Sequence, residues 1–148
     1  MATVDVLIAV DVEGAMSSQS LQNNVYLMDT NKFFGSLQEG QPELITKLRQ
    51  GDRIIWSVTP IDPGTNVSIS GFTGNAVGVN VTPKQNNDGS WTSIFSEAPP
   101  SPGTQIQYSV NLSFEGAQMS FDPFLVLASS VKSEADTNSS PTAVYRPQ

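Results

Sequence analysis

The sequence predicts an all-β protein: a single domain folded as an antiparallel β-sandwich of the jelly-roll or immunoglobulin-like kind, with room for one short helix. Two observations predict this fold. Short runs in which apolar and polar residues alternate recur along the chain, as strands with one buried face require. Turn-forming Pro, Gly, Asn and Asp residues separate these runs at 62–64, 71–75, 86–89 and 99–103. Short strands at such spacing are typical of two stacked sheets, and a closed barrel is the second choice.

The individual strands follow from the alternation. In residues 106–114 the apolar side chains fall on every second position, whereas a helix would scatter them around its circumference. The first run, 4–10, is apolar on both faces, so we expect it to be covered on both sides. Residues 43–50 fit a short helix and a strand equally well. Pro123 interrupts the final run, because proline cannot donate to a ladder. The predicted strands span 4–10, 24–29, 54–58, 67–69, 77–81, 90–95, 106–114 and 119–128.

The predicted sandwich takes up residues 1–128, and residues 129–148 form a tail rich in Ser, Thr, Asn and Pro. Residues 143–145 of that tail could dock as a last strand. The first apolar run resembles the centre of a signal peptide, but it lacks a basic segment before it and a small-residue cleavage pattern after it. We therefore expect a first strand and a cytoplasmic protein, with export without a cleaved signal left open.

Composition removes several classes of function. The 148 residues include no histidine and no cysteine. Ser-His-Asp catalysis, Cys-His catalysis, the usual zinc ligand sets and a disulfide framework are therefore excluded. Fourteen acidic residues stand against seven basic ones, and the net charge of −7 repels phosphate backbones and anionic membrane surfaces. We expect neither nucleic-acid nor membrane binding.

The two tryptophans have different settings. Trp56 falls in register with Ile54 and Val58 in an apolar strand, so we expect it in the core. Trp91 directly follows the polar turn at 86–90, where its ring lies close to a loop. A sugar-binding protein stacks a pyranose on such a ring and fixes its hydroxyls with Asn and Asp. The candidate ligand-binding residues of this lectin-like alternative are Asn86, Asn87, Asp88 and Trp91, and a tryptophan that caps the core is the simpler interpretation.

Acidic residues offer a second candidate site. Asp11 and Glu13 flank the end of the first strand, and two carboxylates two residues apart can point to the same side of an extended chain. Calcium prefers such oxygen ligands but usually takes more of them, and spacing does not show whether Asp88 or Asp122 lies nearby. We therefore expect no metal and no other cofactor, with calcium as the one alternative. A hydrolase built on carboxylates alone is disfavoured, because nothing singles out one pair among fourteen acids.

Four segments in a fixed order carry a family resemblance. They are VDVLIAVDVE at 4–13, VYLMD at 25–29, GDRIIW at 51–56 and FDPFLVL at 121–127. With this order and spacing the chain resembles the bacterial AidA/PixA inclusion-body protein family over residues 3–128. The motif positions, which a structural role would also explain, are Asp11, Glu13, Gly51, Asp52, Trp56, Asp122 and Pro123.

The resemblance implies a small bacterial protein that is abundant in late growth and connected with quorum sensing, host interaction or intracellular inclusions. It carries no enzymatic activity and no catalytic residues with it, so we expect a protein that is not an enzyme. Such a protein would act by self-association, as a homodimer or higher oligomer, or by binding a partner, a glycan being the alternative. The chain has only four methionines, whereas an inclusion-forming member can be rich in methionine.

Overall fold

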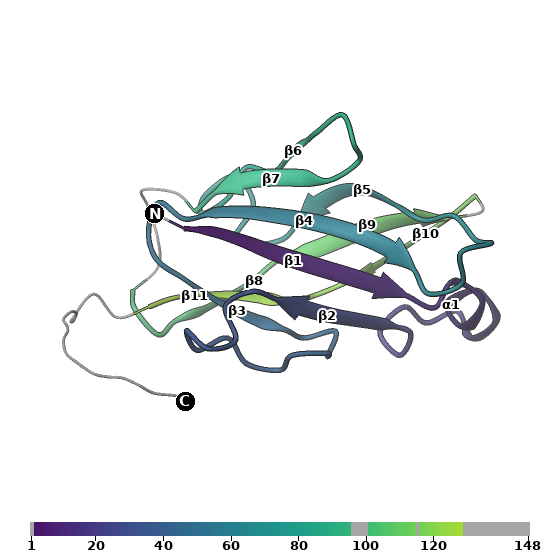
Figure 1. The fold of residues 1–148 in the computed structure, drawn as a ribbon, viewed down its shortest axis with the longest axis horizontal. Helices are drawn as coiled ribbons and strands as arrows, with labels where there is room; N and C mark the ends of the chain where they lie inside the picture. The colour runs from purple at the N-terminus through teal and green to yellow at the C-terminus, as the bar shows by residue number, and fades with distance from the viewer. Residues whose placement is uncertain (1, 96–100, 115, 129–148) are drawn as a thin grey trace.

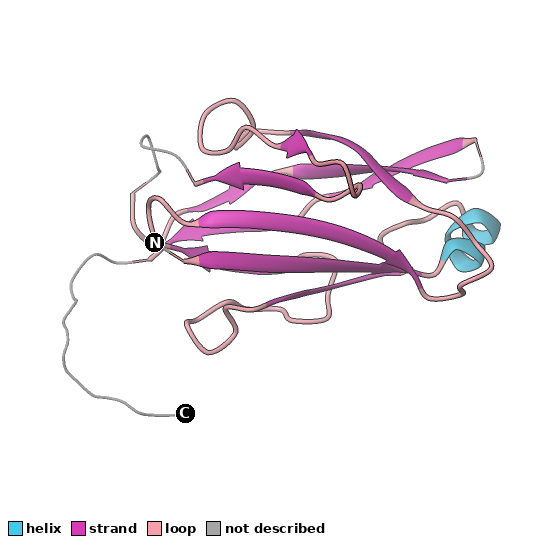
Figure 2. Ribbon diagram, turned by 45° about the horizontal axis from the view of Figure 1, so that its top comes forward, coloured by secondary structure: helices cyan, strands magenta, loops and turns pink. Residues whose placement is uncertain are grey.

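The computed structural model describes residues 2–95, 101–114 and 116–128, and the predicted tail at 129–148, with its docking segment, lies outside them. The described chain is mostly β-strand with one short helix, as the sequence predicts. Its strands run along the long axis of the molecule, and the helix lies at one end of them (Figures 1 and 2). The elements are β1 (Thr3–Val10), α1 (Val12–Ser18), β2 (Val25–Asp29), β3 (Ile45–Leu48), β4 (Arg53–Pro60), β5 (Ser68–Thr73), β6 (Lys84–Gln85), β7 (Trp91–Ile94), β8 (Gln105–Gln107), β9 (Ser109–Phe114), β10 (Ala117–Phe121) and β11 (Phe124–Leu127).

The first layer is a five-stranded sheet in the order β2-β1-β4-β7-β6. The prediction of purely antiparallel strands was wrong here, because β1 and β4 pair in parallel, with Val6 opposite Trp56. The connection between them explains this arrangement. After β1 the chain returns antiparallel as β2 and then crosses to the other layer as β3, so β4 starts at the same end of the molecule as β1.

The second layer is built on one long hairpin that is broken in the middle. β9 pairs with β10 and β8 pairs with β11, and the register is the same on both sides of the break, with Val110 opposite Phe121 and Gln107 opposite Phe124. The strands predicted at 106–114 and 119–128 are therefore each divided in two. The break lies at Pro123, which has no N–H to donate to the ladder. The edges are β5, antiparallel to β9, and β3, parallel to β11.

Aromatic side chains fill the space between the layers. Trp56 is fully buried, as predicted, and its ring lies 4.7 Å from Phe72 and 5.9 Å from Tyr108. The Trp56 Nε1–H donates to the Tyr108 hydroxyl at 3.1 Å, so the polar atoms of these two large buried side chains satisfy each other. Trp91 extends the cluster with its ring 5.4 Å from Phe72. The core is therefore a sandwich core with an aromatic centre.

One open alternative is decided and one element prediction was wrong. Residues 43–50, which fitted a helix and a strand equally well, contain the strand β3, with Leu44 and Leu48 buried, and the one helix of the described chain is α1. α1 has only seven residues and includes a glycine, so it carries little helical signal, and the N-cap Asp11 together with burial of Val12 and Ala15 stabilises it. Residues 77–81 form turns closed by a bridge between their ends, not a strand.

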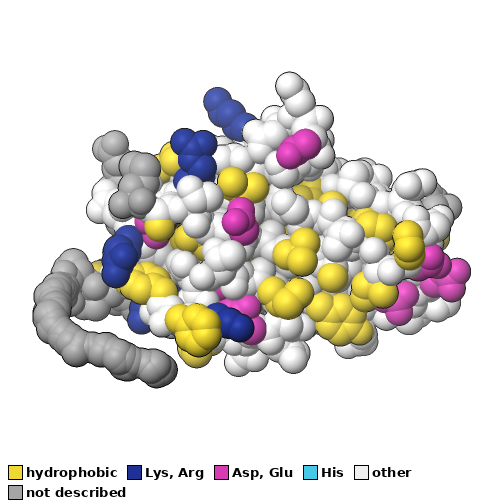
Figure 3. All heavy atoms as spheres, in the orientation of Figure 1, with side chains coloured by type: hydrophobic (Ala, Val, Ile, Leu, Met, Phe, Trp, Pro, Cys, Tyr) yellow, Lys and Arg dark blue, Asp and Glu magenta, His cyan; other side chains and the backbone are white. Residues whose placement is uncertain are grey.

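The outer face of β1 and β2 is open, although the apolar pattern of residues 4–10 predicted cover on both sides. Leu7, Tyr26 and Met28 are 38%, 43% and 44% exposed there. Leu7 lies opposite Met28 in the register of the two strands. Figure 3 shows the hydrophobic side chains of this face in yellow over β1 and β2.

Candidate functional site

The predicted ligand-binding turn joins β6 to β7, and its polar side chains form hydrogen bonds within the hairpin. The Asn86 side-chain amide donates to the hydroxyls of Ser90 at 3.0 Å and Thr92 at 2.7 Å. The Asp88 carboxylate accepts from the Ser90 backbone N–H at 2.9 Å and from its hydroxyl at 2.6 Å. These bonds to Ser90 lower the pKa of Asp88, so it is ionised at neutral pH. Asn87 is exposed at the tip.

Trp91 lies on the other side of this hairpin from the Asn86 amide. Thr92, whose hydroxyl accepts from that amide, is the neighbour of Trp91 in β7, and successive side chains of a strand point to opposite faces. The Trp91 ring packs against Phe72, and its Nε1–H donates to the carbonyl of Ile69 at 3.3 Å. The structure therefore does not bring the four predicted residues together on one surface, and Trp91 caps the core.

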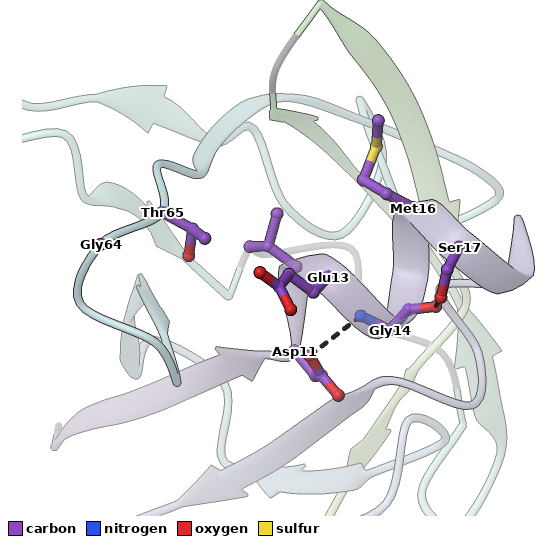
Figure 4. A pocket seen from close by; sticks show the side chains of 8 residues that line it. Asp11, Glu13, Gly14, Met16, Ser17, Gly64 and Thr65 are labelled. Atoms are coloured by element: carbon purple, nitrogen blue, oxygen red, sulfur yellow. Dashed lines mark hydrogen bonds between the residues drawn. The ribbon is translucent and has the colours of Figure 1, made fainter.

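The second predicted cluster lies beside α1. The Asp11 carboxylate accepts from the Gly14 backbone N–H at 3.0 Å and so caps the helix, while Glu13 is exposed in its first turn (Figure 4). Asp88 and Asp122 lie on other elements and do not approach this pair at the cavity it lines. Among the described residues no three Asp or Glu side chains gather closely enough to hold a metal ion together. A calcium ion here would depend on two carboxylates with backbone and water oxygens.

A cavity of about 830 Å³ opens next to these residues, between α1 and the loop that follows β4. The two acidic side chains border it, and Met16 contributes an apolar wall (Figure 4). Its lining consists of Asp11, Val12, Glu13, Gly14, Met16, Ser17, Gly64 and Thr65. We call it the α1 cavity.

The remaining motif positions have structural contacts. Asp52 is buried, and its carboxylate accepts from the backbone N–H groups of Ala2 and Arg49, both at 2.9 Å, which ties the start of β1 to the β3–β4 turn. Gly51, just before it, has φ of +91°, a conformation that favours glycine. Asp122 accepts from the Ser109 hydroxyl at 2.6 Å across the hairpin break.

Two carboxyl groups that the sequence analysis did not single out meet at the edge of the first layer. Asp29, at the end of β2, is 8% exposed, and the Glu39 carboxylate accepts from its backbone N–H at 2.9 Å. One oxygen of each side chain is buried without a partner among the described residues. A proton on one of them lets it donate to the other. Burial and the Asp29 carboxyl raise the pKa of Glu39 from 4.5 to about 7, against smaller opposing effects of the Asp29 backbone N–H and of Lys32.

This carboxyl pair is better suited to holding a loop than to catalysis. Its free oxygens are closed off from solvent, and the other Glu39 oxygen accepts the Asp29 backbone N–H, so neither carboxyl group is presented to a substrate. The same loop donates the Gly40 N–H to the carbonyl of Leu27 at 2.5 Å. Loop 38–41 therefore covers the outer edge of β2, which would otherwise offer unpaired backbone groups.

The most exposed large apolar side chain in the described chain lies earlier in the same connection between β2 and β3. Phe33 is 89% exposed, and the Lys32 ammonium lies 5.2 Å from its ring centre. The neighbouring Phe34 carries the Arg49 guanidinium at 4.2 Å and the Lys47 ammonium at 5.9 Å. The fold thus brings Lys32 together with Lys47 and Arg49, which lie about fifteen residues further along the chain, around two adjacent aromatic rings.

Comparisons with known proteins identify a family and a likeness of fold. The model of a family described as a domain of unknown function, DUF8788, matches residues 2–120. Among solved structures, the chain is similar to the crystal structure of an inclusion body protein (PixA) from Burkholderia cenocepacia J2315. The TM-score is 0.61 at 13% sequence identity, over 87% of this chain and 95% of that one, so the likeness is one of fold. No curated protein matches the sequence. The described part of the chain contains no helix long and apolar enough to cross a membrane.

Proposed function

We propose that this chain, which belongs to the DUF8788 family, is a non-enzymatic protein that acts by associating with further copies of itself. One observation carries the proposal. Large apolar side chains stand exposed on the described surface in more than one place, at Phe33 and Leu37 and on the outer face of β1 and β2. Exposed apolar groups of this kind, collected into patches, mark interaction surfaces on soluble proteins.

The fold supports the same proposal. The inclusion body protein that it resembles is named for a condensed protein body, and a two-sheet sandwich offers broad faces for packing one copy on another. The lack of histidine and cysteine argues against the commonest catalytic machinery. The setting that we propose is the bacterial cytoplasm, with condensation into inclusions at high concentration. Roles in quorum sensing and host interaction are proposed from the sequence resemblance alone.

The experiment is a concentration series of the full chain in sedimentation velocity, with light scattering as a second measure of mass. We expect the weight-average mass to rise above that of the monomer, 15.9 kDa, as the concentration increases. The control is the same series in moderate urea below the unfolding transition, which weakens apolar contacts and should lower the mass. A monomer throughout, up to millimolar concentration, would refute self-association.

A further inference from the structure

We propose that the copies associate head to tail: the Phe33 loop of one copy, residues 31–37, docks in the α1 cavity of the next. The inference rests on the self-association proposed above and specifies the surfaces that carry it. Two surfaces of opposite character, one projecting and one hollow, support the assignment.

The projecting surface is held in shape before any partner arrives. The Asn31 carbonyl accepts backbone N–H groups from Phe34 at 3.0 Å and from Gly35 and Ser36, both at 3.1 Å. The Asn31 side chain donates to the carbonyl of Lys47 at 2.7 Å, which ties the loop to β3. An anchor on a loop ordered in this way loses little conformational entropy on binding. Aromatic side chains, Phe included, are enriched at protein interfaces relative to the rest of the surface.

The hollow surface matches this anchor in chemistry. The α1 cavity, at about 830 Å³, has room for a phenyl ring and its neighbours, and Met16 supplies a polarizable wall of the kind that adapts to an aromatic partner. The carboxylates of Asp11 and Glu13 border the cavity, so a ring that entered would bring the Lys32 ammonium toward negative charge.

The charges near the two surfaces are opposite in sign, basic at the loop and acidic at the cavity. Lys32, Lys47 and Arg49 surround the loop, and Asp62 adds a third carboxylate next to the cavity-lining Gly64, to whose N–H its side chain is bonded. Figure 3 shows the dark blue side chains of this face over its left half, with magenta ones among them, and a magenta group without dark blue neighbours at its right-hand end. Two copies in line therefore place the basic loop of one against the acidic cavity of the next, which offsets the repulsion that the net charge of −7 causes between copies.

The two surfaces lie at opposite ends of the fold. The α1 cavity is at the end where β1 meets α1, and the Phe33 loop follows β2 after that strand has returned along β1. β2 pairs with β1 from Val25 opposite Val10 to Asp29 opposite Val6, a length of about 17 Å at roughly 3.4 Å per residue. A contact between different surfaces of two copies is heterologous, and unless the rotation closes a ring it propagates without limit. Such growth is the kind that a condensed body of protein needs.

The test uses two variants, each blocked at one end. Lys32→Ser with Phe33→Ser removes the anchor, and Glu13→Ser with Ser17→Arg fills the cavity with a bulky cation; all four side chains are exposed, so the fold should tolerate them. We expect each blocked variant to sediment as a monomer at concentrations where the unmodified chain is associated. Because each keeps the surface that the other lacks, an equimolar mixture should form dimers of about twice the monomer mass and nothing larger.

A matched charge exchange provides a second readout. Lys32→Glu and Glu13→Lys should each weaken association of the chain at least tenfold, and the two changes together in one chain should restore it. Ile94→Ser, which removes an exposed apolar group from β7, is the control and should leave association unchanged, whereas Met28→Ser tests the outer face of β1 and β2. Circular dichroism melts of every variant confirm that the fold is intact.

Each result is decisive. If the unmodified chain associates but the blocked variants also associate, or their mixture stays monomeric, the head-to-tail contact is refuted and self-association stands. Loss of association in Met28→Ser alone would assign it to the face of β1 and β2 instead. If the unmodified chain is a monomer throughout, self-association itself fails and this inference fails with it.

Discussion

Replacing Tyr108 by Phe removes one hydroxyl from the centre of the core. That hydroxyl accepts the Trp56 Nε1–H at 3.1 Å, and both side chains are fully buried. The substitution leaves an indole N–H without its partner in a site that water does not reach. A buried donor left unsatisfied costs about 1–3 kcal/mol. For a chain of about 150 residues, each kcal/mol lowers the melting temperature by about 2–4 °C, so we expect a loss of about 2–12 °C.

Urea unfolding followed by tryptophan fluorescence measures the loss of free energy of unfolding, and a thermal melt measures the fall in melting temperature. Tyr26→Phe is the matched control, because the same hydroxyl is removed from an exposed ring, where a change within about 0.5 kcal/mol is expected. The hydrogen bond is isolated by a double-mutant cycle with Trp56→Phe, in whose background Tyr108→Phe no longer strands a donor. If Tyr108→Phe costs the same in both backgrounds, the hydrogen bond does not account for the loss and the reasoning is refuted.

Three further predictions concern the Asp29–Glu39 pair, Asp52 and Trp91. Because the pKa of Glu39 is raised from 4.5 to about 7, the folded chain holds a proton in that window that the unfolded chain has released, so stability should fall as the pH rises through it. Glu39→Gln, which can donate to Asp29 permanently, should flatten this dependence and raise the urea midpoint at pH 8; an unchanged slope would contradict the proton-sharing pair. Asp52→Ala should destabilise the fold by about 2–4 kcal/mol, because two backbone N–H groups lose a charged acceptor, and Asp52→Asn should recover part of the loss in the same assay. On a glycan array we expect no binding that Trp91→Ala abolishes, since the ring packs on the core, and Trp91-dependent binding would revive the lectin-like alternative.

The sequence by itself determined the class of the fold and the centre of its core. Alternation of apolar residues is a local property, so the strands around Trp56 and Val110 and the inward side chains they carry could be read from a single chain. Composition was equally decisive in removing histidine and cysteine chemistry, because no folding can supply a missing side chain. Pro123 marked the break in the final strand for a reason that is also local.

The tertiary structure decided everything that depends on which segments meet. The parallel pairing of β1 with β4 follows from the path of the chain between layers. The strand at 45–48, where the sequence fitted a helix equally well, follows from its pairing with β11. The meeting of Asp29 with Glu39 joins residues ten apart through a loop whose shape no local pattern describes. The same holds for Phe33, whose hydrophobicity predicts burial and whose position on a hydrogen-bonded loop leaves it in solvent. Such contacts are set by the whole chain at once, because the free energy that fixes them comes from the packing of distant segments and not from the residues beside them.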